Sequence, residues 1–198
     1  APRRRLAGNV LRDQALLVSG LLVDERGGPS VKPYQPAKLW SEASNFTYKA
    51  DRGKDLYRRS LYTYWKRTLA PPSMAVLDSA DREQCSVRPK HTNTPLQALT
   101  LLNETCFFEA ARKLGERMLA AGQSAGEQIT FAFRTVTSRS PSNRELDLLR
   151  EAFASYEAAF TRAPDAAKRA LHVGESIPDR ALNTIKLAAA TALANVLL

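Results

Sequence analysis

The sequence has few of the residues that build haem, metal or disulfide sites, because it holds only two cysteines and two histidines among 198 residues. Cys85 and Cys106 belong to no CxxC or CxxCH motif, and no group of cysteine and histidine has the spacing of a zinc site. We therefore expect no haem, metal or other cofactor. Both thiols are expected to be buried and unpaired, and a Cys85–Cys106 disulfide is an open alternative.

The sequence also lacks the common catalytic and membrane signatures. It contains no GxGxxG, P-loop, GxSxG or HExxH motif. The charge-free stretch at the end of the chain, residues 187–198, is twelve residues long, whereas a membrane helix needs about 20. With 44% hydrophobic and 25% charged residues the composition is that of a globular protein. We expect a single helical domain over residues 1–198, cut at both ends from a longer polypeptide.

Positive charge is concentrated at the front of the chain. Residues 1–70 hold 14 lysines and arginines against six acidic residues, which gives +8 of the total +9, while residues 101–198 hold 12 against 11. A basic surface attracts anionic partners such as nucleic acid or acidic polysaccharide. The alternative is that these side chains form a solvated face with local ion pairs.

Hydrophobic periodicity predicts helices and no convincing strand. The clearest local signal is Thr94-Pro95-Leu96-Gln97, a capping box with proline at the first helical position. Ser142 with Glu145 forms a second capping box. The apolar stripes indicate further helices over residues 6–22, 57–68, 107–118, 129–139 and 182–196, with residues 164–178 weakly helical.

In two of these helices we expect the charged residues to lie away from the core stripe. In the first, Leu6, Val10, Leu17 and Leu21 are expected to face the core and Arg12 the solvent. In the helix after residue 105 the expected core stripe is Phe107, Ala111, Leu114 and Met118. The charged residues expected elsewhere on that helix are Glu109, Arg112, Lys113, Glu116 and Arg117.

Two segments without periodicity interrupt the helices. Prolines and glycines break residues 24–56, yet apolar side chains are spread along this segment, which favours a long loop packed on the core. A polar linker covers about residues 70–93, and we expect it to lie against the 57–68 helix and the start of the Thr94 helix. The predicted fold class is all-α, an irregular multi-helix domain with these two segments.

The 57–68 segment and the linker together hold the candidate structural or binding network. Its aromatic and basic residues could stack bases or sugars over a basic groove, or could form a core stripe with arginines over the rings. The network consists of Arg58, Arg59, Tyr62, Trp65, Asp78, Asp81, Arg82, Glu83, Arg88, His91, Asn93 and Thr94.

Three linker carboxylates, Asp78, Asp81 and Glu83, also allow a catalytic hypothesis. Two of them could act as the acid–base pair of a polysaccharide-active enzyme if they faced each other across a cleft. Their spacing does not fit a calcium loop, and ion pairs with neighbouring arginines are the simpler interpretation. Cys85 and His91 as nucleophile and base would need a third, orienting group, so no catalytic residue is assigned.

The run YRRSLYTYWKRTLAPPSMAVLDSADREQCSVRPKHTNTPLQALTLLN resembles part of a domain of unknown function found near the C-terminus of large planctomycete-type multidomain proteins. The pieces RRRLAGNVLRDQALLVSGLL and GGPSVKPYQPAKLW before it, and RSPSNRELDLL and ALANVLL after it, fit the same domain. In those proteins it usually follows a cytochrome-c-like module and a second uncharacterised domain. A departure is Arg88-Pro89-Lys90-His91, where relatives typically carry two arginines after the valine.

The resemblance implies an exported, periplasmic or cell-surface protein and supplies no catalytic residue. Our leading hypothesis is a non-catalytic interaction or structural module that packs against neighbouring domains of the same polypeptide, with anionic polysaccharide as a candidate ligand. The first alternative is a polysaccharide-active enzyme that uses the carboxylates of residues 78–83. The second is a nucleic-acid-binding domain that uses the basic front third of the chain.

Overall fold

The computed structural model describes residues 5–36, 47–66, 69–80, 82, 85, 87 and 92–198. This part of the chain is all-α, as predicted, with isolated β-bridges but no sheet. None of its helices is long and apolar enough to cross a membrane. The helices are α1 Gly8–Ser19, α3 Pro72–Val76, α4 Pro95–Asn103, α5 Thr105–Ala120, α6 Ala125–Thr137, α7 Asn143–Arg162, α8 Pro164–Leu171 and α9 Thr184–Leu197, with short 3-10 helices η1 Gly53–Tyr57 and η2 Ser60–Tyr62.

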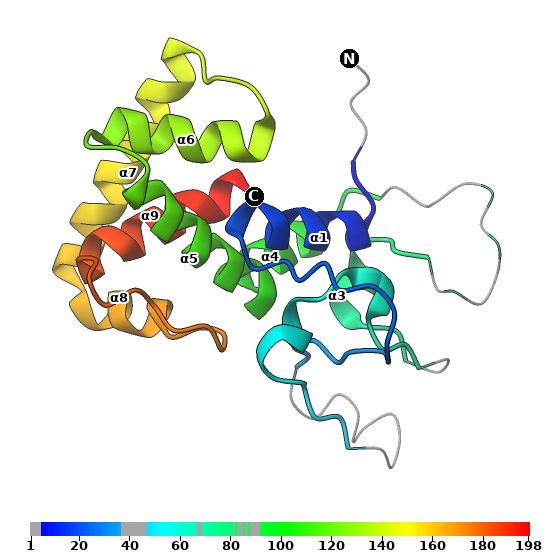
Figure 1. Ribbon diagram of the computed structural model, residues 1–198. Helices are drawn as coiled ribbons and strands as arrows, with labels where there is room; N and C mark the ends of the chain where they lie inside the picture. Colours follow the sequence, from blue (N-terminus) through cyan, green and yellow to red (C-terminus); the bar gives the residue numbers. More distant parts are fainter. Residues whose placement is uncertain are drawn as a thin grey trace.

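Helix α5 lies at the centre of the molecule, with α6 to α9 on one side and α1 and α3 on the other (Figure 1). Its predicted core stripe is confirmed, since the four residues of the stripe are all buried: Phe107, Ala111, Leu114 and Met118. Helix α9 packs closely along α5 because Gly115 has no side chain: an added Cβ would lie 3.0 Å from the backbone nitrogen of Thr191. The core therefore forms along the contact between α5 and α9.

Local capping explains where several helices begin. The boxes predicted at Thr94 and at Ser142 are both present, and Ser124 with Glu127 forms a third that starts α6. The apolar residues predicted for α7 pack on the core cluster around Met118 and Leu193. Pro72, which we expected only to end a helix, lies at the first position of α3.

The predicted helix over residues 57–68 is wrong for the residues that the structure describes. Parallel bridges instead pair Val23 with Arg58 and Val31 with Thr63. The amide of Val31 donates to the carbonyl of Tyr62 at 2.8 Å, and the amide of Tyr64 donates to the carbonyl of Val31 at 2.7 Å. These bonds to the preceding loop replace helical ones. In its described part the loop is packed on the core as predicted, because Val31 is buried. Residues 37–46, on which the prediction also rests, lie outside the described residues.

The predicted orientation of α1 is also wrong. Leu6, Val10 and Leu17 are exposed, whereas Arg12 is buried. The Arg12 guanidinium donates to the carbonyl oxygens of Leu56 at 2.7 Å and Arg58 at 2.9 Å. Since a buried charge is tolerated when hydrogen bonds satisfy it, this face of α1 can turn inward.

The two cysteines are both free, so the open alternative of a disulfide is excluded. Cys106 is buried, as expected, and burial raises the pKa of its thiol to about 12. Cys85 is exposed, which corrects the expectation that both thiols are buried. It lies in the linker, where little apolar chain is available to cover it.

Candidate functional site

Asp78 joins the two ends of the polar linker. Its carboxylate accepts hydrogen bonds from the Thr92 amide at 2.7 Å and the Thr92 hydroxyl at 2.8 Å, and from the Gln97 side chain at 3.2 Å. It also pairs with Arg5. The Thr92 bonds, followed by Arg5, hold the pKa of Asp78 below its usual range. These contacts place the linker against the start of α4, as predicted, and also hold that start beside the end of α3, a helix that the sequence did not predict.

Arg82 joins the linker to the segment that follows η1. Its guanidinium donates to the carbonyl of Ser60 at 3.1 Å and lies over the Trp65 ring, 4.9 Å from the centroid. Arg82 itself is exposed. Among the described residues, its contacts are therefore with neutral groups, a backbone carbonyl and an aromatic ring, and the expected position of the linker is confirmed at this residue.

We expect Arg82→Ala to lower the free energy of unfolding by about 1 kcal/mol, the magnitude of an exposed cation–π contact with weak hydrogen bonds. A thermal melt compared with wild type measures the change. A loss of about 3 kcal/mol or more would instead mean that the mutation leaves a buried carboxylate unpaired.

Arg58 is buried, and its side chain packs against residues 25–29 of the loop that precedes it. It donates to the carbonyl oxygens of Pro29 at 3.0 Å and Glu25 at 3.1 Å, and lies over the Tyr62 ring at 4.1 Å from the centroid. Arg59 is half-exposed beside Asp13, at 3.8 Å. Arg58 thus holds the turn at residues 25–29 and presents no free cation to a ligand.

The other predicted network residues fall into two groups. Thr94 caps α4 and Asn93 is exposed. The remaining four lie outside the described residues: Asp81, Glu83, Arg88 and His91. Whether any of the twelve residues binds a partner stays a prediction.

The most unusual polar cluster lies on α5, where we expected solvent-facing charges. Glu109 and Arg112 have no exposed side-chain surface, and Glu116 is 9% exposed. Arg112 lies 3.7 Å from Glu109 and 3.2 Å from Glu116, and Lys113 pairs with the second carboxylate. We call Glu109, Arg112 and Glu116 the buried array. Its members recur every three or four residues, so they share one face of α5.

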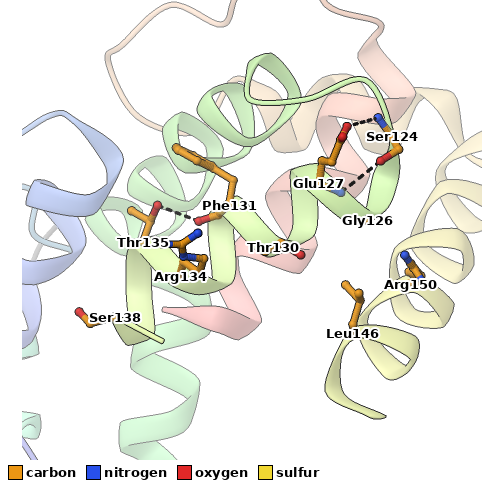
Figure 2. A pocket seen from close by; sticks show the side chains of 10 residues that line it. All are labelled: Ser124, Gly126, Glu127, Thr130, Phe131, Arg134, Thr135, Ser138, Leu146 and Arg150. Atoms are coloured by element: carbon orange, nitrogen blue, oxygen red, sulfur yellow. Dashed lines mark hydrogen bonds between the residues drawn. The ribbon is translucent and has the colours of Figure 1, made fainter. Parts of the chain in front are cut away.

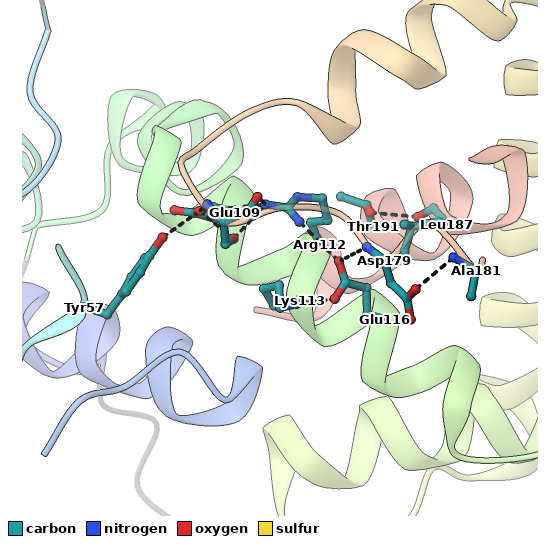
Figure 3. Close-up of polar contacts among 10 residues, drawn as sticks. Tyr57, Glu109, Arg112, Lys113, Glu116, Asp179, Ala181, Leu187 and Thr191 are labelled. Atoms are coloured by element: carbon teal, nitrogen blue, oxygen red, sulfur yellow. Dashed lines mark hydrogen bonds and ion pairs between the residues drawn. The ribbon is translucent and has the colours of Figure 1, made fainter. Parts of the chain in front are cut away.

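A strap of residues 172–183, between α8 and α9, covers the buried array. The amide and hydroxyl of Ser176 each donate to Glu109 at 2.6 Å, and the amide of Asp179 donates to Glu116 at 3.3 Å. Tyr57 donates to Glu109 from the other side at 2.9 Å (Figure 3). The array therefore links the front segment, α5 and the strap.

The chemistry of this cluster is that of a structural link. Ser176 lines a hollow of about 500 Å³ between the strap, α8 and α9. The Ser176 hydroxyl donates to Glu109 and accepts from Arg112 at 2.7 Å. These bonds hold the hydroxyl and the Glu109 carboxylate in place rather than ready to attack a substrate. Asp78, the described member of the predicted catalytic carboxylates, lines neither this hollow nor the one between α6 and α7.

Glu104 caps α5 by accepting from the amides of Cys106 at 3.0 Å and Phe107 at 3.3 Å. Burial raises its pKa from 4.5 to about 7, against the opposing effect of those amides and Arg12. The folded protein therefore keeps this proton to a higher pH than the unfolded chain does. The contribution of this proton to the stability of the folded state is complete below pH 4.5 and is lost as the pH rises towards 7.

We expect the free energy of unfolding to fall with pH over this range because of Glu104, by at most about 3 kcal/mol. Glutamine keeps an oxygen that can cap the helix, so Glu104→Gln should flatten the profile between pH 4.5 and 7. Urea unfolding at several pH values measures it, with Glu151→Gln on the exposed side of α7 as the control. Parallel profiles for wild type and Glu104→Gln would contradict the assignment.

The fold and the buried array define an all-α domain organised around one central helix. The chain belongs to the PSD1 family, described as a protein of unknown function (DUF1553), whose family model matches residues 1–153. No curated protein and no solved structure matches it. The family match ends within α7, so α8, the strap and all of α9 lie beyond it. The planctomycete-type and cytochrome-associated setting stays a prediction.

Proposed function

We propose that this chain is a non-catalytic interaction module that packs against a neighbouring domain of the same exported polypeptide through α4. The observation that supports this is the leucine face of α4, formed by Leu96, Leu99 and Leu102. Their exposed fractions are 57%, 55% and 42%. Large apolar side chains gathered on one helix face are typical of interaction surfaces.

The surroundings of the leucine face support burial by a protein partner. Residues 92–103 contain no charged side chain, in a chain of which 25% is charged. Depletion of charge is typical of the centre of a protein–protein interface. A partner with an apolar helix or sheet face fits this surface, whereas a glycan or nucleic acid would find no charged group on it.

The basic front segment, residues 1–70, uses part of its positive charge in contacts within the fold rather than presenting it to an anionic ligand. Arg12 and Arg58 are buried and donate to backbone carbonyls. Two of the 14 basic side chains of residues 1–70 are therefore used inside the fold. Binding of anionic polysaccharide or nucleic acid, and export, stay predictions.

The test compares thiol labelling at α4 in the 198-residue chain and in the longer polypeptide. Leu99→Cys in a Cys85→Ser background places a thiol on the leucine face, and Leu148→Cys is a matched control with 57% exposure on α7. Cys106 is buried and should react slowly. Mass spectrometry of the modified peptides reports both rates.

We expect labelling at position 99 to be at least about tenfold slower in the longer polypeptide, with no change at position 148. Equal rates at position 99 in both proteins would overturn the proposal. Labelling that slows with rising concentration of the 198-residue chain alone would identify a second copy as the partner and would also overturn it.

A further inference from the structure

A second surface, independent of the leucine face, lies between α6 and α7. It is a groove of about 720 Å³, within the range of ligand-binding pockets. Figure 2 shows Thr130 and Arg134 along α6 and Ser138 just after it, opposite Leu146 and Arg150 on α7. We call this the α6–α7 groove. None of the predicted site residues that the structure describes lines it.

The groove has an excess of hydrogen-bond donors. Arg134 is exposed and has no ion-pair or hydrogen-bond partner among the described residues. Arg150 is half-exposed and has a single weak pair with Asp147 at 3.4 Å. The carboxylate of Glu127, which also lines the groove, accepts from the amides of Gln123 and Ser124 at 3.0 Å each. Two arginines from facing helices are therefore available to an anion.

The position of Arg150 depends on Gly126 in the first turn of α6. A Cβ at that residue would come within 2.4 Å of the Arg150 guanidinium. The missing side chain lets Arg150 reach across the groove towards α6 rather than extend along α7. The missing side chain on α6 and the long side chain on α7 therefore fit together, and the Arg150 guanidinium lies at the edge of the groove.

The lining favours a peptide over a sugar. Phe131 and Leu146 contribute apolar surface to the groove. Arg117 lies over the Phe131 ring at 5.6 Å from the centroid, which occupies a ring face that a sugar would need for stacking. Arginine binds carboxylates through two parallel hydrogen bonds. We propose that the α6–α7 groove binds a short acidic peptide segment in which two carboxylates flank an apolar side chain.

This proposal does not depend on the contact at α4, because it requires a peptide ligand and no neighbouring domain. The test is an NMR titration of the ¹⁵N-labelled 198-residue chain with the capped tripeptide glutamate–leucine–glutamate. Amide signals of residues 130–138 and 146–150 should shift. The lysine–leucine–lysine peptide should leave them unchanged.

Each of the variants Arg134→Gln and Arg150→Gln should weaken binding about tenfold, the effect of losing one charge-assisted hydrogen-bonded contact. Arg162→Gln removes the same charge from the exposed end of α7 and should bind like wild type. All three side chains are exposed, so unchanged melting midpoints are expected and would show that the fold is intact.

Three results would overturn the proposal. The first is acidic-peptide shifts that map outside the groove or persist in the Arg134→Gln/Arg150→Gln double variant. The second is shifts of the groove signals with an oligogalacturonate but not with the peptide, which would identify a glycan site. The third is equal shifts with inorganic phosphate alone at the same concentration, which would identify unspecific anion binding.

Discussion

Replacing Arg112 by alanine is expected to lower the free energy of unfolding by about 3–5 kcal/mol, the magnitude found when one partner of a buried ion pair is removed. Glu109 is fully buried and Glu116 nearly so, and Arg112 lies between them. Without the guanidinium, both carboxylates would stay in the interior without their shared cation. Urea unfolding monitored by circular dichroism measures the loss.

Two controls separate the buried charge from the general effect of losing a long side chain. Lys168→Ala breaks an exposed pair with Asp165 and should change stability by less than about 1 kcal/mol. Replacing all three members of the buried array by uncharged residues of similar size should recover much of the loss, because no buried charge is then left unpaired. Lys113 loses its pair with Glu116, but its side chain is partly exposed. A loss below about 1 kcal/mol for Arg112→Ala would mean that water reaches both carboxylates.

The parts of the fold that the sequence predicted correctly depend on neighbouring residues. A capping box needs a hydroxyl, three residues of spacing and a glutamine or glutamate, and all of these can be read locally. The core stripe of α5 is likewise visible as a helical repeat. The starts of α4 and α7 agree with the structure for this reason.

The wrong predictions involve bonds between distant segments. Residues 57–66 have helical periodicity, but several of their backbone hydrogen bonds go to residues 23 and 31, and no local pattern reports that pairing. The orientation of α1 failed because a buried arginine is rare unless its donors are satisfied, and the carbonyls that bind Arg12 lie more than forty residues away.

The buried array was missed although part of its signal was present. Glu109, Arg112 and Glu116 lie on one helix face, a spacing that also suits a solvent-exposed row of ion pairs. What distinguishes the two cases is the strap, whose amides bind both carboxylates. The strap has no periodicity and its contact with α5 spans more than sixty residues, so the sequence gives no local sign of it.

The strap supplies the second large expected effect, at Gly174. We expect Gly174→Ala to lower the free energy of unfolding by about 3 kcal/mol or more, from backbone strain and overpacking together. Gly174 has φ of +87°, a conformation that costs alanine energy. An added Cβ would also lie 2.3 Å from Cδ of Glu109, which Tyr57 and Ser176 hold in place.

Gly53→Ala is the matched control, because Gly53 has φ of +61° and an added Cβ would meet nothing within 4 Å. It should show the strain alone, about 1–2 kcal/mol. The difference between the two variants then measures how rigidly the strap and Glu109 are held together. Hydrogen exchange should rise at Ser176 and Asp179 in Gly174→Ala only, because their amides donate to the buried array. Equal losses and unchanged exchange would mean that the strap can shift away from α5 at little energetic cost.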